Sequence, residues 1–137
     1  MGTKCLTVIK DNGGKEICVL YRQMDGYLEG HGMDLAIFLQ NMTIINGISS
    51  GDNSNKANGM DCLAAQIIAY FKDGIGSFYL YPANTRNCGE EYIYEVYLQD
   101  KILMIRIINQ YAEENDEQIN VKASDLAKAI NEITEKE

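Results

Sequence analysis

A strand-like run changes into a helix-like run within residues 21–39, YRQMDGYLEGHGMDLAIFL. The eight residues from Asp25 to Gly32 hold three glycines, two acids, a tyrosine and the only histidine of the chain. Glycines permit compact turns, and an aspartate in a turn bonds to its own backbone. The stretch therefore predicts a tight strand-to-helix connection, and its polar side chains make that connection a candidate binding loop.

Hydrophobic periodicity on both sides of this connection predicts a sheet built of hairpins and three helices. Residues 11–14 (DNGG) are a strong hairpin signal between two β-like runs at 4–10 and 15–22. The other predicted strands are 41–48, 77–82, 91–99, 101–110 and a short edge at 119–121, and the predicted helices are 33–42, 59–72 and 125–135. The order β-β-α-(β)-α-β-β-β-α indicates an α+β fold with an antiparallel sheet, forming a single domain over residues 1–137.

Several local details follow from the same patterns. Asn58 is expected to cap the helix that starts at Gly59, and this nearly all-apolar helix is expected to be central and buried. A two-residue turn at 99–100 would place Glu95 and Arg106 on the half-polar face of the last hairpin, where they can pair. Residues 49–58 form a polar loop that is a candidate lid. Cys5 and Cys18 are expected near each other on one face of the first hairpin.

Composition excludes some classes of protein. The net charge of −8 argues against unspecific binding to nucleic acid, which needs a basic face. No apolar run approaches 18 residues and no secretion signal is seen, so we expect neither a membrane span nor export. The four cysteines show no C-x-x-C pairing, which favours free cytosolic thiols over a zinc site.

The residues with catalytic potential do not form a convincing set. Asp25, Glu29 and His31 have metal-binding or acid–base chemistry, but their spacing matches no calcium loop. Cys62 lies in the first turn of a predicted helix, with His31 as a conceivable base, yet it sits on a mainly apolar helix. We therefore predict no catalytic residues, no metal and no cofactor.

Aromatic and basic side chains are better candidates for binding a ligand. Phe78 and Tyr79 belong to a tyrosine-rich strand on which a base could stack. The loop after it carries Asn84 and Arg86, whose donors suit ribose or phosphate oxygens. The remaining candidates for the same pocket are Arg22, Tyr27, His31 and Arg106. The same residue types also suit a protein–protein interface or an ordinary half-exposed sheet.

Four segments carry a family resemblance that covers most of residues 15–98. They are residues 21–32 (YRQMDGYLEGHG), 58–66 (NGMDCLAAQ), 78–82 (FYLYP) and 91–95 (EYIYE). Together they resemble a family of small proteins of phages and prophages, and in size and layout the chain is similar to the anti-Thoeris sponge proteins. The resemblance implies a protein in the cytoplasm of an infected bacterium that sequesters cyclic ADP-ribose or cyclic oligonucleotide signals without cleaving them. It also implies a homo-oligomer, with ligand contacts from the 78–81 strand and the 84–87 loop.

Three hypotheses about function therefore remain open. The first is sequestration of a cyclic nucleotide immune signal. The second is an acidic inhibitor of a bacterial defence complex such as CRISPR, with the acidic loop at 112–118 contacting a basic partner. The third is a small nucleotide hydrolase that uses His31 with Asp25, Glu29 or Cys62.

Overall fold

The computed structural model describes residues 2–48, 50–111 and 117–135. Eight strands and three α-helices are seen in this part of the chain, with a π-helical turn at Leu28–Gly32 and a 3₁₀ turn at Ala123–Asp125. The strands are β1 (Cys5–Lys10), β2 (Glu16–Arg22), β3 (Thr43–Ile45), β4 (Lys56–Asn58), β5 (Phe78–Pro82), β6 (Tyr92–Gln99), β7 (Ile102–Asn109) and β8 (Glu117–Lys122). The helices are α1 (Met33–Leu39), α2 (Gly59–Phe71) and α3 (Leu126–Thr134).

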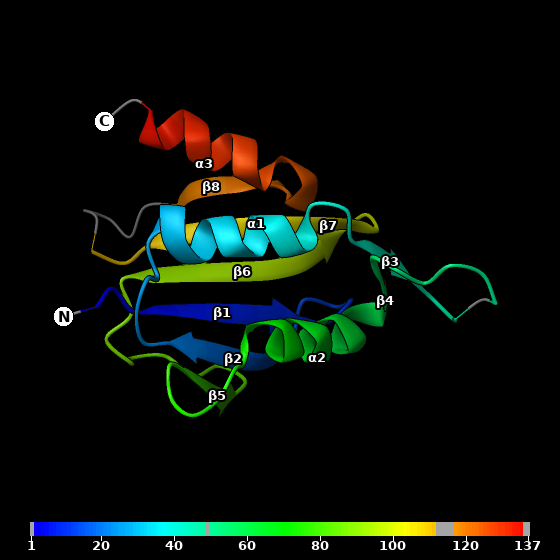
Figure 1. The fold of residues 1–137 in the computed structure, drawn as a ribbon, viewed down its shortest axis with the longest axis horizontal. Coiled ribbons are helices and arrows are strands. Elements are labelled where there is room, and N and C mark those ends of the chain that lie inside the picture. The colour runs from blue at the N-terminus through cyan, green and yellow to red at the C-terminus, as the bar shows by residue number, and fades with distance from the viewer. Residues whose placement is uncertain (1, 49, 112–116, 136–137) are drawn as a thin grey trace.

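Six of the strands form one twisted sheet in the order β5-β2-β1-β6-β7-β8, and β3 pairs with β4 in a separate two-stranded sheet (Figure 1). The hairpins β1–β2, β6–β7 and β7–β8 are antiparallel, as is the pair β2–β5. The predicted α+β class with a mostly antiparallel sheet is therefore confirmed. The central pair β1–β6 is parallel, which the hairpin pattern did not predict.

The main hydrophobic core lies between the sheet and its helical layer. In Figure 1 the helices lie over the sheet, α1 and α2 roughly along the strand direction, with α1 between α2 and α3. The strands point alternate side chains toward this layer because successive residues of a strand face opposite sides. The largest fully buried side chains of the core include Leu20, Leu35, Leu63, Tyr94, Ile105 and Leu126.

A second, smaller apolar cluster lies on the opposite face of the sheet. It consists of Leu6, Val8, Val19 and Ile93, which are buried, and Cys88 packs against it. Cys88 belongs to the connection 83–91, which joins the edge strand β5 to the central strand β6. Because β2 and β1 lie between those two strands, this connection has to cross the sheet, and it covers the second cluster.

Several predicted details are confirmed. The turn at 11–14 joins β1 to β2, where the amide of Asp11 donates to the carbonyl of Lys15. The last hairpin has the predicted faces, and Arg106 Nη1 lies 3.0 Å from Glu95 Oε1. Its turn is displaced by one residue: Asp100 and Lys101 occupy it, both with positive φ, and Gln99 pairs with Ile102.

Other details were wrong. Asn58 precedes α2, but its side chain accepts a hydrogen bond from the amide of Gly47 and caps no helical amide. Helix α2 is buried on one side only, because it lies on the surface of the sheet and exposes residues such as Tyr70. Cys5 and Cys18 share a face but are not neighbours, since Cys5 pairs with Arg22 and Cys18 with Ile9. All four thiols are free.

Two predicted loops agree with the structure only in part or lie largely outside the described residues, and the lengths of the helices bear on a possible membrane span. The polar segment after β3 does not remain a loop to its end, because Lys56–Asn58 adds β4 beside β3. The acidic loop predicted at 112–118 falls largely outside the described residues, apart from its last two positions, which begin β8. Within the described part of the chain, no helix combines the length and the apolar character that crossing a bilayer requires.

Candidate functional site

The connection Asp25–Gly32 is a compact turn held by buried contacts. The amide of His31 donates to the carbonyl of Asp25 at 2.8 Å, and the amide of Gly26 donates to the carbonyl of Thr3 at 2.8 Å. From the sheet, the buried hydroxyl of Tyr94 donates to the carbonyl of Gly26 at 2.7 Å. These bonds fix Asp25 in the left-handed region, with φ of 64°.

Close approach explains why glycine occupies this turn. A Cβ atom at Gly30 would lie 2.4 Å from the carbonyl oxygen of Asp25, and one at Gly26 would lie 2.8 Å from Cys5 Cβ. Neither glycine has a positive φ. The glycines are therefore needed because the backbone of the turn lies against itself and against β1, which supports the structural interpretation of this stretch.

His31 is fully buried beneath the turn. Its Nε2 lies 2.6 Å from Thr7 Oγ1, and its Nδ1 lies 3.1 Å from Arg22 Nη1. Because a guanidinium only donates hydrogen bonds, Nδ1 must accept, and the proton of the neutral ring sits on Nε2 and points to Thr7. Burial, together with the charge of Arg22, lowers the pKa of His31 to about 3. A neutral ring with both nitrogens occupied has no free atom for a substrate or metal.

Arg22 and Phe78 complete this cluster. Arg22 Nη1 forms an ion pair of 2.8 Å with Asp34, and Nη2 lies 4.0 Å from Asp25. The guanidinium also lies over the ring of Phe78, with 5.0 Å to the ring centroid. The structure thus brings together Arg22, His31 and Phe78 of the predicted site residues, but it uses them to hold the turn against the sheet.

The other predicted residues lie elsewhere. Tyr79 is on the edge strand β5, where its ring is 6.0 Å from that of Tyr21.

Arg86 forms a bidentate ion pair with Glu16, which also accepts a hydrogen bond from the amide of Asn84. Burial opposes ionisation of Glu16, but these bonds outweigh it and lower its pKa below the ordinary value. Arg106 pairs with Glu95 and with Glu117 at 2.6 Å.

All three arginines of the chain therefore face carboxylates. A guanidinium in such a pair is largely neutralised and does not offer a vacant cradle for phosphate.

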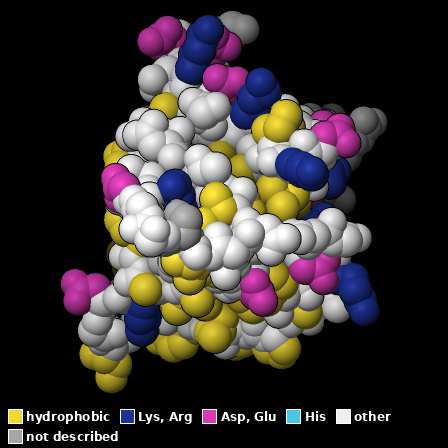
Figure 2. Space-filling view, turned by 90° about the vertical axis from the view of Figure 1, so that its right-hand side faces the viewer, with side chains coloured by type: hydrophobic (Ala, Val, Ile, Leu, Met, Phe, Trp, Pro, Cys, Tyr) yellow, Lys and Arg dark blue, Asp and Glu magenta, His cyan; other side chains and the backbone are white. Residues whose placement is uncertain are grey.

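Figure 2 shows Lys, Arg, Asp and Glu side chains interspersed over the upper part of one face. Hydrophobic side chains gather in the lower part, where Figure 1 places α2 and β5.

An open groove of about 790 Å³ contains Tyr27 of the predicted residues. The remaining lining comes from the residues before β1, the β2–α1 connection, the end of the crossing segment and the second residue after β7. The residues that line it are Gly2, Thr3, Lys4, Gln23, Met24, Asp25, Tyr27, Gly89, Glu91 and Tyr111.

Parallel pairing of β1 with β6 assembles this groove. Cys5 pairs with Tyr92, so the residues that precede these strands, Lys4 and Glu91, are adjacent, and the Glu91 amide donates to the Lys4 carbonyl at 2.8 Å. The amide of Gln110 donates to the Glu91 carbonyl, which places the next residue, Tyr111, at the same end of the sheet. Sequence patterns did not reveal Lys4, Glu91 or Tyr111, because their proximity depends on this pairing.

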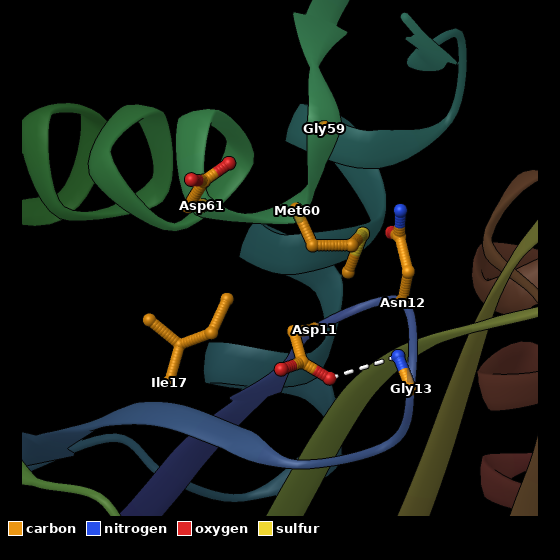
Figure 3. A pocket seen from close by; sticks show the side chains of 7 residues that line it. All are labelled: Asp11, Asn12, Gly13, Ile17, Gly59, Met60 and Asp61. Atoms are coloured by element: carbon orange, nitrogen blue, oxygen red, sulfur yellow. Dashed lines mark hydrogen bonds between the residues drawn. The ribbon is translucent and has the colours of Figure 1, made fainter.

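A smaller hollow of about 400 Å³ lies between the 11–14 turn and the start of α2 (Figure 3). Its polar side chains include Asp11 and Asp61. The Asp11 carboxylate already accepts the amides of Gly13 and Lys15, and Asp61 accepts the amide of Cys62. These carboxylates stabilise the local backbone, and no aromatic or basic side chain lines the hollow, so the groove is the better candidate site.

No described group of three or more His, Cys, Asp and Glu side chains has the geometry to hold a metal ion. Comparison with known proteins gave no match, since no protein-family model, no curated protein and no solved structure is significantly similar to this chain. Function is therefore inferred from the groove.

Proposed function

We propose that this protein binds a nucleotide-type small molecule in the groove and sequesters it without converting it. The observation that carries the proposal is the presence of two exposed tyrosines, Tyr27 and Tyr111, in one groove of ligand size. Pockets for small molecules typically measure about 300–1,000 Å³ and combine aromatic surface with a few polar groups. The groove, at about 790 Å³, falls within this range.

Stacking supplies the binding energy in this proposal. Tyr27 and Tyr111 are 41% and 70% exposed, so both residues have surface available to a planar base. Stacking of one base on an aromatic side chain contributes about 1–3 kcal/mol. The ammonium group of Lys4 lies near the backbone of Gly89 in the same lining and is the cation available to a phosphate.

The positions of His31 and Cys62, the candidate base and nucleophile of the hydrolase hypothesis, support sequestration over hydrolysis. His31 is buried with both ring nitrogens engaged, so it does not reach a ligand in the groove. Cys62 lies on α2, outside the groove lining, and its thiol is 3.4 Å from Gln66 Oε1. The groove offers Asp25 and Glu91 as hydrogen-bond acceptors.

The biological role in this proposal follows the resemblance described above. The ligand is a cyclic nucleotide signal such as a cyclic ADP-ribose isomer, and the setting is the cytoplasm of a phage-infected bacterium. Binding alone suffices for such a role. When the protein concentration exceeds the signal concentration, and the dissociation constant is smaller than both concentrations, most of the signal is bound and the free signal falls. A homo-oligomer is part of the same proposal.

One observation favours a second candidate function, the acidic inhibitor of a defence complex. The pairing of Arg22, Arg86 and Arg106 with carboxylates removes the strongest phosphate-binding groups from the surface. With a net charge of −8, the remaining surface suits a basic protein partner. Under this alternative the groove would bind no nucleotide.

The test is a binding experiment with ligand recovery. The protein is dialysed against cyclic ADP-ribose isomers and cyclic di- and trinucleotides, and bound material is released by heat and identified by mass spectrometry. We expect micromolar binding and recovery of the unchanged ligand. Absence of binding to the whole set would reject the proposal, and recovery of a cleaved product would favour the hydrolase.

A matched pair of substitutions locates the site. Tyr27→Ala and Tyr79→Ala each remove a tyrosine of similar exposure, 41% and 44%, but only Tyr27 lines the groove. We expect Tyr27→Ala and Tyr111→Ala to weaken binding about tenfold or more, and Tyr79→Ala to bind normally. The opposite result would place the site on β5.

A further inference from the structure

We propose that Asp25 is the residue that selects the ligand of the groove, by accepting hydrogen bonds from the two neighbouring hydroxyls of a ribose. This inference rests on the proposed function, because it concerns the same groove. It adds the part of the ligand that is recognised and the residue that recognises it.

The backbone of Asp25 is fixed before any ligand arrives. Its carbonyl accepts the amide of His31, and the next residue, Gly26, is bonded through its amide to Thr3 and through its carbonyl to the Tyr94 hydroxyl. A site held by such bonds loses little conformational entropy on binding, so its interactions contribute more to affinity.

The side chain of Asp25 is available to a ligand. It is 58% exposed, and it lines the groove together with Tyr27. Arg22 stands behind it, but the guanidinium is committed to Asp34 at 2.8 Å and to His31 at 3.1 Å, whereas its distance to Asp25 is 4.0 Å. The carboxylate oxygens of Asp25 therefore keep acceptor capacity for hydroxyl donors.

The charges in the lining select which end of a nucleotide lies beside Asp25. Among the lining residues Asp25 and Glu91 are acids and Lys4 is the one base. Phosphate beside two carboxylates is repelled, whereas hydroxyls donate to them. A ribose presents two adjacent O–H donors to two carboxylate oxygens, and charge-assisted bonds of this kind are stronger than neutral ones. An acidic side chain reads ribose hydroxyls in the same way in dinucleotide-binding folds.

The experiment compares adenosine, 2′,3′-dideoxyadenosine and ADP-ribose by isothermal titration calorimetry on the full chain. We expect the wild-type protein to prefer adenosine over the dideoxy compound about tenfold or more, as expected for loss of bonds to a charged acceptor. Asp25→Asn and Asp25→Gly should abolish that preference.

Two variants separate recognition from folding. Asp25→Gly removes the carboxylate at a φ of 64°, and Asp100→Gly makes the same change at a φ of 52° in the β6–β7 turn, outside the groove. Glycine adopts both conformations freely, and we expect only Asp25→Gly to lose the ribose preference. If Asp25→Gly fails to fold, Asp25→Asn carries the test, because asparagine also tolerates positive φ.

The outcomes distinguish the two proposals. Equal wild-type affinity for adenosine and the dideoxy compound, or an unchanged preference in the folded Asp25 variants, would overturn the role of Asp25 and leave the proposed function standing. Failure of ADP-ribose and both nucleosides to bind at millimolar concentration would overturn this inference, and the proposed function would fall with it only if the cyclic nucleotides of the dialysis experiment also failed to bind.

Discussion

At the scale of single residues, contact distances decide the Asp25–Gly32 turn. Gly30 is required because the carbonyl oxygen of Asp25 occupies the space of its missing side chain. His31 is required because it connects Thr7 of β1 to Arg22 of β2 from beneath the turn. The sequence shows polar residues typical of a binding loop, but the His31 ring bonds to Thr7 and Arg22, and the amide of His31 bonds to the carbonyl of Asp25 within the turn.

Gly30→Ala tests the close approach. The added methyl group would lie 2.4 Å from the Asp25 carbonyl oxygen, so the turn must shift. We expect a loss of about 2–4 kcal/mol in the free energy of unfolding, measured by urea denaturation. Gly13→Ala is the control, since its nearest contact is an ordinary 3.5 Å to Asp11 and it should lose nothing. Equal urea midpoints for the two variants would contradict the close-approach explanation.

His31 predicts a particular dependence of stability on pH. Its pKa is about 3 in the folded protein against an ordinary 6.5, so between these values the unfolded chain binds a proton that the folded protein does not. Stability is therefore fully present above pH 6.5 and falls with decreasing pH, by up to about 1.4 kcal/mol per pH unit.

The measurement is a series of urea denaturations between pH 7 and pH 5, a window above the usual titration of carboxylates. His31→Gln keeps a donor and an acceptor but does not titrate, so its stability should be lower and nearly independent of pH in this window. A wild-type curve that is flat between pH 7 and pH 5 would show that the ring takes up its proton equally in the folded and unfolded states, which would contradict the lowered pKa.

At the scale of elements, the edge strand β5 protects itself from pairing with another strand. The carbonyl of Ser77 accepts the amide of Gln23 on the side of β2, so the backbone carbonyl of the next residue, Phe78, faces the open edge of the sheet. Lys72 Nζ donates to the carbonyl of Phe78 at 2.8 Å. Further along, Pro82 has no amide hydrogen and its carbonyl accepts the hydroxyl of Thr85. Lysine and proline on an edge are common means of preventing aggregation.

Removing Lys72 should therefore expose the edge. We expect Lys72→Ala to self-associate with increasing concentration, because the Phe78 carbonyl loses its donor beside the already exposed apolar side chains of Leu80 and Ile75. Sedimentation velocity at several concentrations is the measurement. Lys128→Ala makes the same charge change on an exposed position of α3 and should sediment as the wild-type protein does. Identical behaviour of both variants would remove Lys72 from this role.

At the scale of the whole molecule, the crossing segment 83–91 joins the two halves of the sheet. Its end is anchored by Glu90, which is buried and accepts the amide of Cys88 at 2.7 Å and the side chain of Gln110 at 3.4 Å. Because Gln110 precedes Tyr111 and Glu91 follows Glu90, the same anchor positions the wall of the groove.

Glu90→Ala should consequently destabilise the protein and weaken ligand binding together. Loss of the acceptor leaves a partly buried amide without its partner, which corresponds to about 1–3 kcal/mol in urea denaturation. Glu132→Ala, an exposed change on α3, should remain within about 0.5 kcal/mol of the wild-type protein. A Glu90→Ala protein as stable as the Glu132→Ala protein would mean that the crossing segment is held by other contacts.

The sequence predicted the local elements because each depends on neighbours along the chain. The 11–14 turn, the faces of the last hairpin and the Glu95–Arg106 pair follow from turn chemistry and two-residue alternation. The candidate site was predicted less completely, since Tyr27 lines the groove but Arg86 and Arg106 are paired with Glu16 and Glu95. Residue type shows what an arginine can bind, but the fold determines which carboxylate reaches it first.

The sequence by itself determined the α+β class, the hairpins, the three helices and the compact glycine turn, since periodicity and backbone freedom are local properties. Only the tertiary structure decided that β1 lies parallel to β6. That pairing joins residues almost ninety positions apart, Cys5 and Tyr92, and the energy that favours it comes from burying the two faces of the sheet. The groove with Lys4, Asp25 and Glu91 exists because of this long-range burial, which no local pattern records.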